Sequence, residues 1–600
     1  MPEQNVFKAI PPRLIRFLAF LFCLLPPVLL AILIWRNAVN VPWLDEWDTD
    51  IAGTFFKSHT GQLTFGDLWA QHTETRLLLP RIFFLVLGNL THWNVLYEMA
   101  ATFFLAVVIA ATVFHLGRLT FPGKPWIHWP AFFLSSLMIF SPVQSEAWLW
   151  GMELILYVPL LCILLSLAFH YSRAGNWPVW LMGVMMAMIS TYTFINGLLV
   201  WVVLFPVFFL ADGRHGLWEK RRPALAWLAA FLANGLIYFH NYTFPPANGL
   251  WQKPWTNPLP LLHYFLAFLG EPLSDIGWSG MSQKGPISLA IATIFGGIAF
   301  TTFVVCCFCA FRRRNDPRLM RLVLPWLAIG WYGVFSAALA TSGRALEFGA
   351  EQALSSRYGI FGISLLIALV HLMPLLGLHG LPAGGARKRM AGFCGAGVIL
   401  AVGFLLVLPP EMTEMNFIRL SRLLGKSGLD FIQVLPQQPA TGVLFPRYPT
   451  LLRMAGELNQ QQIFDRPLLA DNRLSSLKQP ALSSDEILGH MENFKPLPGM
   501  KFQMSGWAIS PFHAGPADCV VFTYETPTNE PVIFKLMGQR VFRYDLAAKT
   551  GDNDFLMTGW IAFGDNAELP KGPVRIRAWA YDVEERTAAP LQGKVDLDIK

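Results

Sequence analysis

Long apolar runs, separated by short polar segments, occupy the first two-thirds of the chain. A membrane-spanning helix needs about 20 mostly apolar residues, so this pattern predicts a polytopic α-helical membrane domain of about eleven spans. The pair of runs at 178–212 also fits one broken helix that turns at Asn196 and Gly197. The expected spans are residues 17–36, 95–116, 128–143, 153–171, 178–195, 197–212, 223–240, 286–311, 322–341, 357–379 and 390–409.

Lys and Arg gather in alternate loops, and the positive-inside rule assigns such loops to the cytoplasm. Lys8, Arg13 and Arg16 precede the first run, so we expect a cytoplasmic N-terminus and, with an odd number of spans, an external C-terminus. The first run, Phe17 to Trp35, resembles a signal peptide, but its length and the lack of a small-residue cleavage site favour a retained span. The expected cytoplasmic segments are 1–16, 117–127, 172–177, 213–222, 312–321 and 380–390.

Two of the expected outer loops are long, at residues 37–94 and 241–285. In the first, Phe65 to Leu90 has the composition of an interfacial helix, with basic residues among Leu, Phe and Trp. In the second, Leu259 to Leu269 is apolar but too short to cross the membrane, which predicts an interfacial or re-entrant helix.

The end of the chain reads as soluble protein. Residues 1–410 form the predicted multi-span domain, residues 411–499 a mixed linker or subdomain, and residues 500–600 show the two-residue alternation of strands. This last part predicts a small β-sandwich. The stretch Phe502–Trp507 recurs as Phe555–Trp560, which indicates two equivalent strands or, as the alternative, a sugar-binding surface on the two Trp residues.

Composition and charge narrow the function classes. The chain is 54% hydrophobic and 14% charged, against roughly 25% charged in soluble domains. The net charge of +7 lies in short loops between apolar runs, which excludes a nucleic-acid surface as its explanation. Six of the seven Cys lie in apolar runs, so neither a disulfide framework nor a zinc motif is expected. No P-loop is present, which argues against ATP-driven transport.

The strongest local signal is the acidic segment Trp43–Asp50, directly after the first span. It holds Asp45, Glu46, Asp48 and Asp50. Carboxylates at a membrane surface can act as a general base, hold a cation or bind sugar hydroxyls. The alternative is a solvated acidic loop, since charge runs are usually solvated.

Further charged groups fall on the same expected face. His72 and Arg76 are spaced to share one helical face, and Glu74 lies on another. Glu146 follows the third span in a Trp-rich segment, and Arg344, Arg357 and Tyr358 lie between the ninth and tenth spans. Charged groups near the membrane often mark a substrate path, and Arg presents paired donors to a phosphate. The spans therefore resemble the walls of an outer-face site more than a pore.

This arrangement resembles the GT-C superfamily of membrane glycosyltransferases, which includes protein O-mannosyltransferases and aminoarabinose transferases of lipid A. Members carry an acidic motif in a long outer loop after the first span, take a sugar from a polyprenyl phosphate, and often end in a soluble outer domain. The stretch Ser355–Tyr358 also looks like one found in uncharacterised bacterial members. The resemblance covers residues 1–410 as architecture, and only these short motifs in sequence.

The resemblance implies an inverting transferase on the outer face of a bacterial inner membrane, acting on a glycan or lipid acceptor. It places the catalytic base at Asp45, with Glu46 and Asp48 as the next choices. The donor phosphate falls to Arg357, then to Arg344 and Tyr358, and no cofactor or metal is assigned. The residues expected to position substrate or to brace the loop are His72, Glu74, Arg76 and Glu146.

Two other function classes stay open. An O-antigen-type polymerase or ligase also uses outer loops and Arg, but its key loops come later in the chain. A lipid or sugar flippase is expected to show two related halves with interrupted helices, and the sequence shows no such halves.

Overall fold

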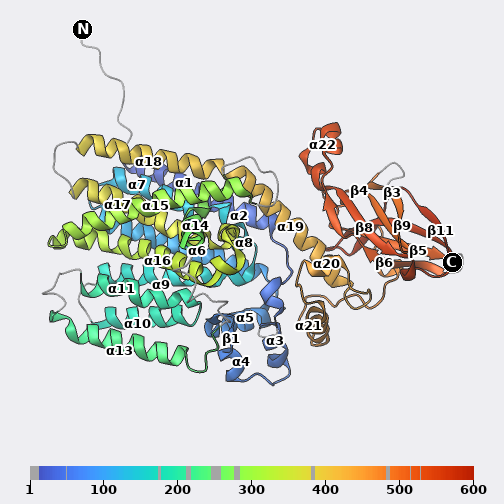
Figure 1. Cartoon of the computed structure of the whole chain (residues 1–600), viewed down its shortest axis with the longest axis horizontal. Helices are drawn as coiled ribbons and strands as arrows, with labels where there is room; N and C mark the ends of the chain where they lie inside the picture. The colour runs from blue at the N-terminus through green and yellow to red at the C-terminus, as the bar shows by residue number, and fades with distance from the viewer. Residues whose placement is uncertain are drawn as a thin grey trace, which may run out of the picture. The chain divides into compact units, whose positions relative to one another are not determined.

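The computed structural model describes residues 12–48, 51–172, 177–210, 218–244, 258–275, 284–379, 386–480, 487–513, 515–526 and 529–600 (Figure 1). Several predicted features fall outside these residues. They are Asp50, the centre of the outer loop 241–285, the first eleven residues, and most of the cytoplasmic segments 172–177, 213–222 and 380–390.

The chain folds as two compact units, each described by itself below. The membrane unit comprises Met1–Ala38, Thr64–Phe84 and Leu96–Asn416, and the β unit comprises Val39–Leu63, Leu85–Val95 and Phe417–Lys600. The acidic segment after the first span therefore belongs to the β unit.

The long elements of the membrane unit are all α-helices, and the larger ones run alongside one another (Figure 1). The helices are α1 (Pro12–Cys23), α2 (Leu25–Asn37), α4 (Phe65–Trp69), α5 (Leu78–Thr91), α6 (Leu96–Thr120), α7 (Pro125–Ile139), α8 (Ser145–Trp148), α9 (Leu154–Ser172), α10 (Trp177–Thr191), α11 (Leu198–Phe209), α13 (Arg221–Tyr238), α14 (Pro258–Gly270), α15 (Pro286–Arg312), α16 (Pro317–Phe348), α17 (Gly359–His379), α18 (Ala386–Leu406) and α19 (Leu408–Asp430).

Among the described residues, eight helices are long and apolar enough to cross a membrane. In the most apolar window of Ser356–Leu378, 83% of the residues are buried, against 11% for Met390–Asp430. The segment Ser356–Leu378 therefore lies in the centre of the unit. The apolar part of Met390–Asp430 presents its side chains outward, as a lipid-facing helix does. The prediction of a multi-span helical membrane protein with a C-terminal β-sheet domain is confirmed.

One expected span has a break, and the paired runs at 178–212 form two helices. The first expected span consists of α1 and α2, because Pro26 and Pro27 open α2 and supply no amide hydrogens to a continuous helix. The pair at 178–212 forms separate helices, α10 and α11, with Asn196 and Gly197 in the 3₁₀ turn between them. A Cβ on Gly197 would lie 1.9 Å from the carbonyl oxygen of Ser190, so this turn requires glycine.

The prediction of one helix over Phe65–Leu90 is wrong. Helix α4 ends at Trp69, a hairpin of β1 (Gln71–His72) and β2 (Thr75–Arg76) follows, and α5 begins at Leu78. Thr73 has a φ of 46°, which a helix does not accommodate. His72 and Arg76 therefore do not share a helical face. His72 pairs with Thr75 and Arg76 with Gln71 across the hairpin.

Helix α14 contains the predicted short apolar helix and packs tightly on α15. A Cβ on Gly296 would lie 1.8 Å from the carbonyl oxygen of Leu266, and a Cβ on Gly270 would lie 1.9 Å from that of Ala292. Small residues at such crossings let two backbones approach closely, which is the usual source of helix association in lipid.

The β unit contains two antiparallel sheets. One has the order β10-β9-β5-β6 with β11 also on β9, and the other has the order β3-β4-β8-β7. The Phe522 and Trp560 rings, one from each sheet, meet at 5.3 Å, so the sheets face each other as a sandwich. The strands are β3 (Gly489–Leu497), β4 (Lys501–Ala508), β5 (Cys519–Thr526), β6 (Asn529–Leu536), β7 (Gln539–Val541), β8 (Gly559–Asp565), β9 (Gly572–Asp582), β10 (Thr587–Pro590) and β11 (Val595–Ile599).

The repeated Phe–Trp stretch corresponds to neighbouring strands. In the register of β4 and β8, Gly506 faces Trp560 and Trp507 faces Gly559. Trp560 is 1% exposed and packs in the core. Because Trp560 is buried, the two Trp residues do not form a surface pair that could bind a sugar.

The helices of the β unit come from the early segment Val39–Leu63 and from the part of the chain that begins at Phe417. They are η1 (Leu44–Trp47), α3 (Ala52–His59), the C-terminal part of α19, α20 (Pro439–Gly442), α21 (Tyr448–Gln460) and α22 (Tyr544–Thr550). Asp430, at the end of α19, accepts hydrogen bonds from the Tyr581 hydroxyl at 2.8 Å and from Arg586 at 2.6 Å. This buried acid ties the helix to the sandwich.

The glycine contact between α14 and α15 gives a first prediction. Gly296→Ala forces the two backbones apart and should lower the stability by about 1–3 kcal/mol, measured as the midpoint of thermal unfolding in detergent. Gly297→Ala is the matched control, since its Cβ would meet only Leu266 Cδ1 at 3.9 Å. Equal midpoints for the two variants would contradict the close-packing interpretation.

Candidate functional site

The sequence-predicted site residues belong to both units, so the two groups are described one after the other. In the membrane unit, Arg344 and Arg357 share one aromatic ring. The guanidinium carbons lie 5.4 and 5.1 Å from the centroid of Tyr358, which is 6% exposed. Arg357 also lies 5.6 Å from the ring of Trp150. The attraction of each cation to the Tyr358 ring holds both guanidinium groups around that ring.

Carboxylates accompany both arginines. Arg344 forms an ion pair with Glu74 at 2.9 Å, and Arg357 lies 3.8 Å from Glu153. Burial by itself would raise the pKa of Glu74, but the nearby Arg344 and a hydrogen bond to Thr73 outweigh burial and lower it. Glu74 is therefore ionised at neutral pH and helps to hold Arg344 charged and in place.

Arg76 and His72 lie within the hairpin as buried groups. Arg76 donates hydrogen bonds to the carbonyl oxygens of Tyr238, Trp69 and His240 at 2.6, 2.9 and 2.6 Å. His72 is 8% exposed. The bonds of Arg76 are those of a brace, because a guanidinium that binds three carbonyl groups holds the loop against α13.

Glu146 joins two segments of the unit. Its Oε2 accepts a hydrogen bond from the Ser355 hydroxyl at 2.9 Å, and its backbone N–H donates to the Ser356 hydroxyl at 3.1 Å. These bonds fix the Ser355–Tyr358 segment, and hence Arg357, against the short helix α8.

An ionic cluster that sequence reasoning missed lies in the same unit. Lys284 Nζ lies 2.7 Å from Glu271 and 3.5 Å from Glu411, whose side chains are 0 and 1% exposed. A Cβ on Gly359 would lie 3.0 Å from Glu271 Oε2, so the start of α17 passes directly over this carboxylate. The only sequence signal for the cluster is that its members flank predicted spans.

The cluster has an unusual electrostatic setting. Burial raises the pKa of Glu271 to about 7, even though Lys284 favours the charged form. The carboxylates of Glu146 and Asp275 add to the rise. A carboxyl group that titrates near neutrality is suited to exchange protons, so Glu271 joins the candidate residues of this site.

In the β unit, the acidic segment forms the 3₁₀ turn η1. Glu46 is 3% exposed and accepts a hydrogen bond from the backbone N–H of Trp43 at 2.6 Å, as a capping residue does. Asp48 accepts from Arg447 at 3.1 Å, and Trp43 packs under Arg422 at 3.2 Å. Asp45, which lies between Trp43 and Asp48 in sequence, is partly buried. The turn is thus a built structure and not a solvated loop.

The predicted residues fall into two groups. In the membrane unit, Arg344, Arg357 and Tyr358 come together with Glu74, and Glu146 holds the Arg357 segment in place. In the β unit, Asp45, Glu46 and Asp48 occupy one ordered turn. The paired guanidinium groups can bind a phosphate, and the carboxylates can orient hydroxyl groups or accept protons.

The comparisons with known proteins give a limited result. The chain is similar to the crystal structure of ArnT from Cupriavidus metallidurans in the apo state, with 13% identity, a TM-score of 0.37, and coverage of 73% of this chain and 85% of that chain. It is also similar to that enzyme bound to undecaprenyl phosphate, with 14% identity, a TM-score of 0.35, and coverage of 75% and 89%. Both TM-scores are below 0.5, so no residue role is transferred from that enzyme. No protein-family model and no curated protein matches the chain.

The buried cluster gives a second prediction. Lys284→Met leaves Glu271 and Glu411 without their shared cation and should lower the stability by about 3–5 kcal/mol. The loss should grow as the pH rises above about 7, because the variant must keep on Glu271 a proton that the parent protein releases near that pH. Unfolding midpoints at pH 6 and pH 8.5 measure both effects.

Lys478→Met is the control for this variant. Its pair with Glu585 is exposed, at 71 and 60%, and such pairs contribute about 0–1 kcal/mol. The double variant Lys284→Met, Glu271→Gln should recover part of the loss, since it removes one uncompensated charge. A pH-independent loss equal to that of the control would contradict the assignment.

Proposed function

We propose that the chain is an inverting glycosyltransferase that moves a sugar from a polyprenyl-phosphate donor to a glycan or lipid acceptor of the cell envelope. The observation that carries the proposal is the pair of guanidinium groups around Tyr358, held inside a helical membrane unit. A donor of this kind presents a phosphate at the end of an apolar chain. The membrane unit offers both matching features, because its outer helices are apolar and its Arg pair is cationic.

The geometry around Arg344 and Arg357 supports a role toward phosphate. Glu74 orients Arg344 by a 2.9 Å contact, whereas the Arg357–Glu153 separation of 3.8 Å exceeds hydrogen-bonding distance. As the bond between the sugar and the phosphate breaks, negative charge develops on the phosphate, and fixed cations stabilise it most in a water-poor site.

The reaction would proceed by in-line displacement. An acceptor hydroxyl loses its proton to a carboxylate, its oxygen forms a bond to the anomeric carbon, and the bond from that carbon to the phosphate oxygen breaks. The polyprenyl phosphate leaves with the electron pair and needs little acid assistance. The resemblance assigns the base to Asp45, and Glu271 is the second candidate because its pKa of about 7 suits proton transfer.

The proposal also includes the membrane and the orientation of the protein in it. The distribution of Lys and Arg favours a cytoplasmic N-terminus and an external C-terminal domain. In a bacterium this corresponds to the inner membrane with the β unit in the periplasm. No cofactor is proposed for the transfer itself.

The phosphate role of Arg357 gives a third prediction. Arg357→Gln should weaken binding of undecaprenyl phosphate and lower kcat/KM for sugar transfer by about 100-fold, since one fixed charge donor commonly contributes that much. Native mass spectrometry of the detergent-solubilised protein measures the binding, and it requires no knowledge of the acceptor. Initial rates with a short-chain polyprenyl-phosphate sugar and an envelope lipid fraction measure the transfer.

Arg314→Gln is the matched control for Arg357→Gln. Arg314 is exposed and packs on Phe311 at 4.4 Å, in a predicted cytoplasmic loop. This variant should bind and transfer as the parent does. A requirement for a lipid-pyrophosphate donor would instead favour the polymerase or ligase alternative, and lipid movement without any covalent change would favour a flippase.

The assignment of the base gives a fourth prediction. Asp45→Asn should lower kcat by about 10²–10⁴-fold while the binding of undecaprenyl phosphate stays unchanged. Asp465→Asn, which alters an exposed contact to Asn40 in the same unit, should leave both quantities unchanged. Undiminished transfer by Asp45→Asn would reject Asp45 as the base, and the same experiment on Glu271→Gln would then decide for the second candidate.

A further inference from the structure

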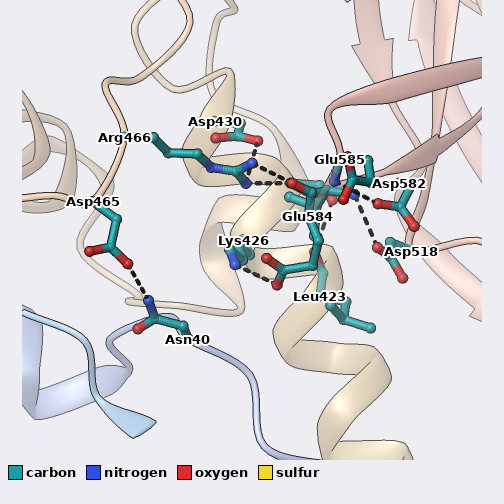
Figure 2. Close-up of polar contacts among 12 residues, drawn as sticks. Asn40, Leu423, Lys426, Asp430, Asp465, Arg466, Asp518, Asp582, Glu584 and Glu585 are labelled. Carbon is teal, nitrogen blue, oxygen red and sulfur yellow. Dashed lines mark hydrogen bonds and ion pairs between the residues drawn. The ribbon is translucent and has the colours of Figure 1, made fainter. Parts of the chain in front are cut away.

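A histidine and two aspartates converge at one end of the sandwich. The ligand atoms of His513, Asp518 and Asp582 all lie within 4.8 Å of one another. His513 Nε2 is 3.6 Å from Asp518 Oδ1. The register of β5 and β9 pairs Cys519 with Tyr581, so the next residues outward, Asp518 and Asp582, come from adjacent strand ends. Figure 2 shows their carboxylates beneath the turn that carries Glu584 and Glu585.

The local backbone holds this group in position. Asp518 Oδ2 accepts a hydrogen bond from the Val583 N–H at 3.0 Å, and Asp582 Oδ1 accepts one from the Glu585 N–H at 2.8 Å. His513 is carried by a short loop that closes where the Ser510 N–H donates to the Gly515 carbonyl at 3.0 Å. The three side chains are therefore oriented by two strand ends and one closed loop, and not by an unstructured surface.

A buried oxygen independently points to a missing ligand. Asp518 is 2% exposed, and among the described residues its Oδ1 accepts no hydrogen bond. A buried carboxylate oxygen without such a bond is costly. Asp582 is also buried, at 5% exposed, and its carboxylate lies within 4.8 Å of that of Asp518. A cation between the two groups would relieve this penalty.

The neighbouring charges leave room for such a cation. Arg540 donates to the carbonyl oxygens of Ala517 and Asp518, at 2.7 Å each, and it supplies one positive charge near the site. Glu584 and Glu585, which follow Asp582, are paired with Lys426 at 2.5 Å and with Lys478 at 3.3 Å. The two carboxylates and Arg540 together carry a net charge of about −1, which a divalent ion would offset.

We propose that His513, Asp518 and Asp582 form a binding site for a divalent transition-metal ion of the Zn²⁺ class. The imidazole nitrogen favours this class over Ca²⁺ and Mg²⁺, which prefer oxygen ligands alone. Bonds of about 2.0–2.1 Å at the tetrahedral angle bring ligand atoms to about 3.3–3.4 Å apart, so the group must contract slightly on binding. The loop of His513, one-third exposed, can supply that movement.

The ion would join the His513 loop to the turn between β9 and β10. That turn is also tied to the segment after α21, because Arg466 donates to the carbonyl oxygens of Val583 and Glu584, and to α19, because Lys426 pairs with Glu584 (Figure 2). The metal would thus stiffen the end of the sandwich nearest α19. This role is separate from sugar transfer, and its test does not depend on the proposed function.

The test uses the full-length protein, solubilised in detergent, with any affinity tag removed and any bound metal stripped by a chelator. The parent protein should take up about one equivalent of Zn²⁺ or Co²⁺ and show a higher unfolding midpoint with metal. Bound Co²⁺ should give a visible absorption spectrum. His513→Gln and Asp518→Asn should each weaken uptake by at least about tenfold.

Asp596→Asn is the matched control, since this exposed acid of β11 pairs with Arg575 near the start of β9, away from Asp582 at its end, and should not affect uptake. The Asn side chain in Asp518→Asn can still accept the hydrogen bond from Val583, and the exposed His513→Gln provides a second variant that spares the core. Absence of uptake by the parent protein, or uptake that both variants retain in full, would overturn the proposal.

Discussion

Pairing of buried charge in the membrane unit governs how its segments meet. Lys284 holds Glu271, from the 3₁₀ turn Glu271–Leu273 after α14, and Glu411, from the start of α19, at 2.7 and 3.5 Å. Removing Lys284 from this cluster leaves the buried carboxylates without their shared cation, which costs more than most packing defects. Gly359 lies directly over Glu271, and the segment that carries Arg357 and Tyr358 ends at that glycine. The position of the predicted phosphate-binding residues therefore depends on the buried ion pair.

Close backbone contact supplies the second constraint on this unit. Gly270 and Gly296 let α14 and α15 touch, and Gly333 in α16 lies where a Cβ would come within 2.5 Å of the Phe361 carbonyl. Helices in lipid lack a strong hydrophobic drive toward one another, so such contacts fix their separation. As a result α16, which carries Arg344, and α17, which follows Arg357, are held at a distance that lets both cations share one tyrosine ring.

The sequence allowed the helices to be predicted because each depends on local apolar length. It also placed Arg344, Arg357 and Tyr358 on a common face, since loop charge sets orientation. The helix expected over Phe65–Leu90 failed because composition does not show the positive φ that turns the chain at Thr73. The ion pairs were missed for another reason. Asp48 and Arg447 are 399 residues apart in sequence, and Glu271 and Lys284 are 13 apart, so only the tertiary fold brings them together.

The two units differ in how they neutralise their acids. In the membrane unit, Glu74, Glu153 and Glu271 each lie next to a cation of the same unit. In the β unit, Glu46 is satisfied by a backbone amide and Asp48 by Arg447, which accounts for two acids of the motif by structure alone. Asp518 and Asp582 are arranged differently, because two buried carboxylates lie together and Asp518 Oδ1 accepts no hydrogen bond from the described residues. Two such carboxylates beside an imidazole are the physical reason to look for an ion at that end of the sandwich.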